Sequence, residues 1–226
     1  MTSGLNEHIK KKREIFSGFS AGETRRSTSR LSATAEVHDD SGVRRIAVRD
    51  FRYMSDSGSG TAGYDLGPSS PELFLSSLAS CLCHIFLVQA AVRNVRLDAI
   101  ACRAEASLLN GAGAFHDDSM PGYPHDISYT VDLLSEEPEE CLLWLWEAVR
   151  AHCPIYLLIS RAVPVGGTLR RVSVGSPAIV LGSHRDVEVQ AAACRDRVDQ
   201  GLQLPGRGRL GPAGFQNSAI SADLGF

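Results

Sequence analysis

Residues 67–92 have the sequence GPSSPELFLSSLASCLCHIFLVQAAV, which contains no Asp, Glu, Lys or Arg after Glu72. Apolar side chains occupy every side of a helical projection of this stretch, and such a helix is either a membrane span or the buried axis of a folded domain. Its length reaches the roughly 20 residues that a bilayer requires. However, Ser80, His84 and Gln89 interrupt it, and no basic or aromatic cluster brackets both ends. We therefore predict a buried central helix, with a membrane span as the alternative.

Capping chemistry marks the start of this helix. Ser69 or Ser70 can act as the N-cap, and Pro71 suits the first helical turn because its φ angle is already helical. The carboxylate of Glu72 then lies near the positive end of the helix dipole. The helix is therefore expected to begin at these residues.

Composition limits the classes to which the protein can belong. The chain has 226 residues and a formal net charge of −3, which suits one domain with extensions and gives no electrostatic reason to expect nucleic acid as a partner. The first residues contain no unbroken apolar segment, so we predict no secretory signal. The six cysteines include no CxxC pair, the spacing typical of zinc and thioredoxin-type sites. We expect a cytoplasmic protein with reduced thiols and without a bound metal or a membrane partner.

The chain divides into three parts. Residues 1–29 predict an N-terminal helix, amphipathic over 5–16, followed by a linker rich in Ser, Gly and Thr. Residues 30–171 contain the periodic patterns of a folded domain. Residues 172–226 have little periodicity and are predicted to be a largely disordered extension.

Alternation of apolar residues in the middle part predicts strands on both sides of the central helix. The expected strands are 31–37, 43–53, 95–108, 125–134 and 162–165. Residues 55–66 form a flexible glycine-rich loop with no phosphate-binding motif. Ser135 can cap a second helix, which should stop or kink near Cys153, because a residue followed by proline is disfavoured in the α region.

This order of elements indicates an α+β fold. A helix that is apolar on all sides needs more cover than one small sheet supplies. An intertwined homodimer would supply that cover.

Two segments together resemble the OsmC/Ohr family of osmotically inducible and organic hydroperoxide resistance proteins. The first is GPSSPELFLSSLASC at 67–81, and the second is the distant pair Cys153-Pro154. The PGY at 121–123, the VPV at 163–165 and the leading helix are also similar to the family. The resemblance covers about residues 30–170 and makes 30–171 an OsmC-like domain.

The resemblance implies antiparallel sheets wrapped around long buried central helices in an intertwined homodimer, with two active sites at the interface. It further implies reduction of organic hydroperoxides in oxidative-stress defence, with Cys81 as the peroxidatic cysteine and Cys153 as the resolving cysteine of a Cys81–Cys153 disulfide. No resident cofactor is implied; an external thiol or a dithiol reductant such as a lipoylated protein would restore the enzyme.

Family members also have a glutamate at the start of the central helix and an arginine from the first hairpin, which activates the cysteine. Glu72 is the candidate acid, although it lies one residue closer to Cys81 than the usual glutamate does. About 13 Å of helix separates the two, so Glu72 could act only through an arginine or as a charge at the helix N-terminus. Arg30, Arg44 and Arg45 lie on or beside the hairpin, and we prefer Arg44.

Other residues have alternative interpretations. Cys83 lies about 200° around the helix from Cys81, so the two cannot face one site. His84 could favour a Cys81 thiolate if protonated, or could be a core histidine bonded elsewhere. Cys102 and Cys141 are expected in the core. Cys194 falls in the extension, and the cluster His116, Asp117, Asp118, His125 and Asp126 is expected to be a polar loop rather than a metal site.

Two functions of different classes are consistent with the sequence. The first is a cysteine-based peroxidase that acts on alkyl or lipid hydroperoxides. The second is a non-catalytic OsmC-like protein that binds a small hydrophobic ligand at the dimer interface; a structural stress-response module is a third. Convergence of an arginine and an acid on Cys81 would distinguish the first from the second.

Overall fold

The computed structural model describes residues 4–17, 28–38, 40–109, 111, 121–161, 165, 168–173 and 176–183, the last two segments by their backbone. These residues belong to two compact units, Met1–Val163 and Pro164–Phe226. The first unit contains four α-helices and five strands among its described residues, together with a short 3-10 helix. Its sheets are antiparallel, so the described part of the chain has the α+β class that the sequence predicts.

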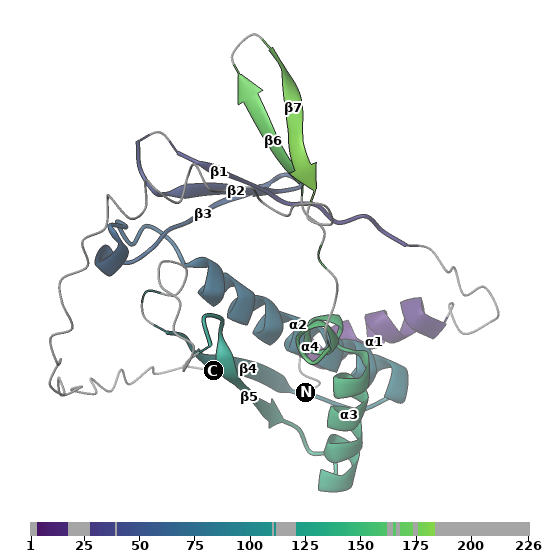
Figure 1. The fold of residues 1–226 in the computed structure, drawn as a ribbon. Coiled ribbons are helices and arrows are strands. Elements are labelled where there is room, and N and C mark those ends of the chain that lie inside the picture. The colour runs from purple at the N-terminus through teal and green to yellow at the C-terminus, as the bar shows by residue number, and fades with distance from the viewer. Residues whose placement is uncertain are drawn as a thin grey trace, which may run out of the picture. The chain divides into compact units, whose positions relative to one another are not determined.

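The central helix, α2, spans Ser70–Arg93 and has Ser69 as its N-cap (Figure 1). It ends at Asn94, which adopts a left-handed conformation with φ 58° and donates its backbone N–H to the carbonyls of Ala90 and Ala91. The predicted start of the helix is therefore confirmed.

Helix α2 packs against α1 (Gly4–Ser17), α3 (Glu139–His152), α4 (Pro154–Ile159) and β4 (Ala99–Ser107). Its buried apolar side chains lie on one side, as Leu78, Leu82 and Phe86 do, whereas its other sides are partly exposed in the single chain. The expectation of burial on every side is thus not met within one chain. By length and composition α2 could also cross a bilayer, but its contacts with four other elements are those of a core helix.

The N-terminal helix α1 is attached to the core by packing and by hydrogen bonds. Ile9 is buried in the core cluster, and the guanidinium Nε of Arg13 donates to the carbonyl oxygen of Ala91 at 3.0 Å. That carbonyl lies in the last turn of α2, where main-chain acceptors have no partner within the helix. Helix α1 therefore helps to cap α2 at its C-terminus.

Strand β4 pairs with β5, His125–Leu134, in an antiparallel sheet whose one face packs on the core. Side chains of β5 alternate between partly buried and exposed, which confirms the predicted alternation. The core-facing residues of β5 are Ile127, Tyr129, Val131 and Leu133.

Strands β1 (Thr34–Val37), β2 (Arg44–Val48) and β3 (Phe51–Ser55) form a second antiparallel sheet. The predicted strand at 43–53 is wrong in one respect, because a tight turn divides it into β2 and β3. Arg49 in that turn has a φ of 52°, a left-handed conformation that a continuous strand does not contain.

The segment 55–66, predicted to be a flexible glycine-rich loop, contains a short 3-10 helix, η1, at Ser59–Thr61. Its organiser is the carboxylate of Asp56, which is 1% exposed. This carboxylate accepts backbone N–H groups of Ser57 at 2.7 Å, Tyr64 at 2.9 Å and Leu66 at 3.2 Å. The segment is rich in glycine, as the sequence shows, but the shape of the loop depends on one acidic side chain.

Asp56→Asn is expected to lower the thermal unfolding midpoint at pH 7, because an amide offers one acceptor oxygen to the three N–H groups. The hydrogen bond from Ser57, and those from Leu66 and Tyr64, lower the pKa of Asp56 below its ordinary value of 3.8 against the opposing effect of desolvation. The carboxylate therefore stabilises the fold above about pH 4, and this stabilisation is lost as the pH falls through the folded-state pKa. Calorimetry should show a difference between wild type and variant that is constant from about pH 7 to 5 and shrinks towards about pH 3. An undiminished difference in acid would contradict this role.

One prediction about the C-terminal half needs correction. Ser135 does not cap α3, which begins at Glu139 after Pro138; instead its hydroxyl donates to the carbonyl of Arg96 at 2.6 Å. In the second unit, β6 (Thr168–Ser173) pairs with β7 (Ser176–Ser183) in an antiparallel hairpin. Strand β7 lies in the extension that was predicted to be largely disordered, whereas 184–226, with Cys194, lies outside the described residues, as do 162–164 of the predicted last strand.

Candidate functional site

The structure brings Cys81 and Cys153 together from separate elements. The sulfur of Cys153 donates to the sulfur of Cys81 at 3.4 Å. Cys81 lies in the middle of α2, and Cys153 lies at the junction of α3 and α4, where it has extended backbone with φ −74° and ψ 111°. This break in the helix follows from Pro154, as predicted, because proline disfavours helical backbone in the residue before it.

The two thiols differ in exposure and in electrostatics. Cys153 is 0% exposed, and Cys81 is partly exposed. Burial raises the pKa of Cys153, although the backbone N–H groups of Tyr156 and Ile155 oppose this rise. Cys153 is therefore a neutral thiol near pH 7 and can donate its proton to a hydrogen bond. A thiolate on Cys81 would accept that bond.

An apolar cavity of about 600 Å³ lies along the side of α2 that carries Cys81. Phe74, one of its lining residues, precedes Cys81 by seven residues, or two helical turns, so the two side chains share a face and lie about 10 Å apart along the axis. Helix α4, which begins directly after Cys153, contributes two more lining residues from its far end. The cavity is lined by Ser70, Pro71, Phe74, Tyr123, Pro124, Ile127, Leu158 and Ile159.

Neither Glu72 nor Arg44 has a contact with Cys81 among those of the described residues. The Glu72 carboxylate accepts both the backbone N–H and the hydroxyl of Ser69 at 2.7 Å, and these bonds lower its pKa. This is the helix-terminal role that the sequence left open. The Arg44 guanidinium donates to the carbonyl of Gly42 at 3.1 Å and to the hydroxyl of Ser55 at 3.2 Å. Among the described residues of the single chain, no arginine and acid converge on Cys81.

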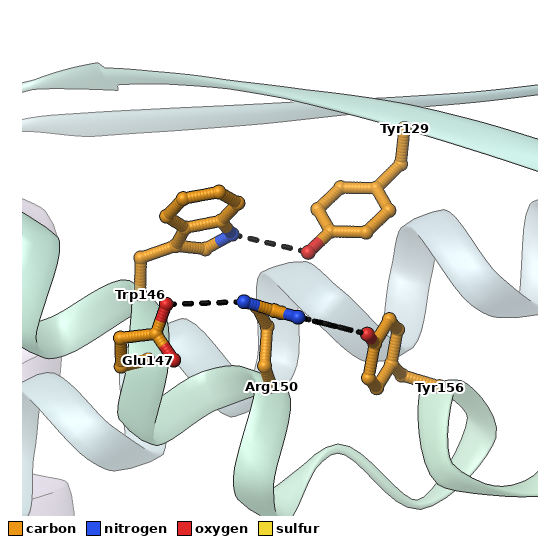
Figure 2. Close-up of polar contacts among 5 residues, drawn as sticks. All are labelled: Tyr129, Trp146, Glu147, Arg150 and Tyr156. Carbon is orange, nitrogen blue, oxygen red and sulfur yellow. Dashed lines mark hydrogen bonds and ion pairs between the residues drawn. The ribbon is translucent and has the colours of Figure 1, made fainter. Parts of the chain in front are cut away.

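A polar and aromatic cluster joins side chains of α3, α4 and β5 (Figure 2). Arg150 points its guanidinium at the hydroxyl of Tyr156, and Trp146 donates its indole N–H to the hydroxyl of Tyr129 at 3.1 Å. No pattern in the sequence predicts a functional role for these residues. The spacing of Arg150 and Tyr156 in the sequence would have indicated their contact only if a helix at 154–159 had been predicted.

Residues 61–166 match the family model described as OsmC-like protein. The chain contains an OsmC-like domain. The match includes the elements that carry Cys81 and Cys153, and it confirms the family resemblance drawn from the sequence.

Solved structures similar to the OsmC-like domain include an OsmC-like protein from Mycoplasma pneumoniae, with 16% sequence identity and a TM-score of 0.52 over 59% of this chain and 89% of that chain. This similarity shows the fold alone. An organic hydroperoxide resistance protein OsmC from Legionella pneumophila matches with 16% identity and a TM-score of 0.43, over 59% of this chain and 91% of that chain. No curated protein matches the chain.

Another cysteine, Cys102, lies near the Cys81–Cys153 contact, because it interacts with both Cys83 and Cys153. Cys102 packs on the core, and burial followed by interaction with Cys83 raises its pKa strongly. His84 is exposed, and desolvation together with nearby Lys12 lowers its pKa, so it is neutral near pH 7 and supplies no cation. Cys141 packs on the core as predicted.

The predicted polar loop is only partly described, since His116, Asp117 and Asp118 lie outside the described residues. His125 and Asp126 lie on β5, and the distance from His125 Nε2 to Asp126 Oδ2 is 3.7 Å. Within the described part of the chain, no group of three His, Cys, Asp or Glu side chains is arranged to hold a metal ion.

Proposed function

We propose that the protein is a cysteine-based peroxidase that reduces organic hydroperoxides in oxidative-stress defence. The observation that carries this proposal is the pair of sulfur atoms 3.4 Å apart, one partly exposed and one buried. Two thiols so placed can close into a disulfide with a small rotation of the side chains, because a disulfide requires sulfur atoms about 2 Å apart. Membership of the OsmC-like family supports the same chemistry.

The partly exposed thiol suits the first step. A Cys81 thiolate attacks one oxygen of the hydroperoxide, the O–O bond breaks, and the alcohol leaves after it takes up a proton. The sulfur becomes a sulfenic acid. Cys153 then attacks this sulfur, water leaves, and the Cys81–Cys153 disulfide forms. Two electrons and two protons from an external dithiol restore both thiols.

The apolar cavity supports alkyl or lipid hydroperoxides as the substrate class. Its lining is mainly apolar, and Phe74 places it on the face of α2 that carries Cys81. Burial of a substrate's hydrocarbon part contributes about 25 cal/mol per Å² of apolar surface, which hydrogen peroxide cannot obtain.

A second copy of the chain is the proposed partner. Large apolar side chains are exposed on single elements of the chain, among them Phe51 and Met54 of β3 and Trp144 of α3. Such surfaces mark interfaces in soluble proteins. The Nε atom of Arg44 is buried without a hydrogen-bond partner among the described residues, so we propose that Arg44, with Glu72, acts on Cys81 only in the homodimer. The site would need no resident cofactor, and a cytoplasmic thiol or lipoylated protein would supply the electrons.

The test is consumption of cumene hydroperoxide and of hydrogen peroxide by the reduced protein, with dihydrolipoamide as the reductant. We expect kcat/KM for cumene hydroperoxide to exceed that for hydrogen peroxide by about 10- to 100-fold, from burial of the aromatic group. Phe74→Ala should reduce the preference, whereas Tyr64→Ala, which alters a side chain that is 64% exposed in the 55–66 loop, should leave it unchanged. Turnover no faster than free dihydrolipoamide would refute the peroxidase.

The volume of the same cavity favours a second candidate, a non-catalytic protein that binds a small hydrophobic ligand. Cavities of 300–1,000 Å³ are typical of small-molecule sites. The expected result for this function is that peroxide is not turned over and that a fluorescent apolar probe binds saturably. Phe74→Ala should abolish the binding of the probe.

A further inference from the structure

Cys153 lies between two residues that bond to each other across the α3–α4 junction. Arg150, in the last turn of α3, donates from Nε and from Nη2 to the hydroxyl of Tyr156, each at 3.4 Å. Tyr156 is in the first turn of α4. The bonds therefore close a short loop of chain around Cys153, whose extended backbone is the only break between the two helices.

The guanidinium has further contacts that fix its place (Figure 2). It pairs with the Glu147 carboxylate at 3.0 Å and lies over the Trp146 ring, 5.4 Å from its centroid. Trp146 in turn donates to Tyr129, whose ring meets the ring of Tyr156 edge to face with centroids 6.1 Å apart. Both ends of the bridge are thus held by neighbours on α3 and β5.

The first turn of α4 also carries the N–H groups that face the sulfur of Cys153. Hydrogen bonds from the backbones of Tyr156 and Ile155 favour the thiolate of Cys153, against the effect of burial. Movement of this turn would shift both the sulfur and the N–H groups that stabilise its charge. Catalytic geometry is sensitive to such shifts, since a displacement of about 1 Å can cost about 100-fold in rate.

We propose that Arg150 and Tyr156 are positioning residues that hold Cys153 ready to close the disulfide with Cys81. This role rests on the proposed function, because it concerns its second step. In that step, the Cys153 thiolate forms a bond to the sulfenic sulfur of Cys81 and hydroxide leaves, which takes up the proton lost by Cys153 to become water. The side chains of Arg150 and Tyr156 would act only through the stretch of chain that carries Cys153.

The experiment compares Tyr156→Phe, Arg150→Met and the double variant with wild type and with Tyr64→Phe as a control. Tyr64 is a tyrosine whose side chain is 64% exposed. Each reduced protein receives one equivalent of cumene hydroperoxide with dimedone present, and mass spectrometry follows the Cys81–Cys153 peptide and the dimedone adduct of Cys81. We expect closure to be about 3- to 10-fold slower in both single variants, the scale of one hydrogen bond, and the adduct to increase accordingly.

Three further measurements test the proposal: the rate of peroxide loss, the closure rate of the double variant and the circular dichroism spectrum. The rate at which peroxide disappears in the first turnover should be unchanged, and the double variant should be no slower than either single variant, because both changes remove one bridge. Formation of the disulfide at the wild-type rate would refute the proposal that the Arg150–Tyr156 bridge, called the clamp below, positions Cys153. Additive effects of the two substitutions would refute it as well. Circular dichroism checks that Tyr156→Phe, which removes a single oxygen atom, remains folded.

A second arm separates failure of the clamp from failure of the proposed function. The aromatic disulfide 4,4′-dithiodipyridine converts Cys81 to a mixed disulfide, and attack by Cys153 then releases thiopyridone and forms the same Cys81–Cys153 bond without peroxide. If the wild-type protein does not react with hydroperoxide, the peroxidase function is refuted. Slower formation of the Cys81–Cys153 disulfide by Tyr156→Phe in this second arm would still support the clamp. Equal closure in wild type and variant refutes the clamp whatever the peroxide arm shows.

Discussion

Cys81→Ser should abolish turnover of cumene hydroperoxide, with a loss of at least about 10³-fold in kcat/KM, because a serine hydroxyl cannot take the place of the attacking thiolate. Cys153→Ser should keep the first step but stop at the sulfenic acid, so that one equivalent of peroxide is consumed and turnover with dihydrolipoamide then becomes slow. Stopped-flow consumption of peroxide and mass spectrometry of the Cys81 peptide measure the two effects separately.

Cys83→Ser is the matched control for these cysteine changes. It alters a thiol on the same helix, two residues from Cys81, whose interaction is with Cys102 rather than with Cys153. Full activity is expected. Loss of turnover with Cys83→Ser and its retention with Cys81→Ser would mean that the reactive thiol lies on the other side of α2.

Leu82→Ala should lower the free energy of unfolding by about 2–5 kcal/mol, the range for removal of a leucine side chain from a packed core. Leu82 is 0% exposed and lies where α2 meets the rest of the core cluster. The loss combines the lost burial of apolar surface with the cavity that remains, since neighbouring helices relax only in part. Urea unfolding followed by circular dichroism gives the value.

Leu143→Ala provides the comparison, because the same atoms are removed from a leucine that is 50% exposed on α3. Its effect should be below about 1 kcal/mol, as for most surface changes. A loss at Leu143 as large as that at Leu82 would contradict the core described here and would instead indicate that a partner covers this part of α3.

The elements that were predicted correctly are those whose causes are local. The N-cap at Ser69 and the uncharged run after Glu72 account for α2, the alternation from His125 to Leu134 accounts for β5, and Pro154 accounts for the break at Cys153. Each depends on residues within a few positions of one another, so the chain itself contains the necessary information. The proximity of Cys81 and Cys153 could be expected only through the family resemblance, since no local pattern relates residues so far apart.

The features that were missed depend on contacts between distant residues or on weak patterns. Asp56 organises its loop through N–H groups as far along the chain as Leu66, which a composition of Gly and Ser does not reveal. The hairpin of β6 and β7 lies in a segment of weak alternation. The preference for Arg44 over Arg30 and Arg45 stays a prediction, because a guanidinium on a hairpin can reach many partners; in this chain it bonds to Gly42 and Ser55.

The unequal exposure of the two sulfur atoms also sets the direction of the return half of the proposed cycle. In the disulfide, an incoming reductant can reach only the Cys81 side, since Cys153 has no exposed surface in the chain. The transient adduct with the reductant would therefore form on the central helix, and the departing sulfur would be that of Cys153. That sulfur leaves as an anion toward the N–H groups of Ile155 and Tyr156. The same arrangement that protects Cys153 from solvent thus gives the electrons a single point of entry, and it slows the departure of Cys153, because burial raises the pKa of this thiol.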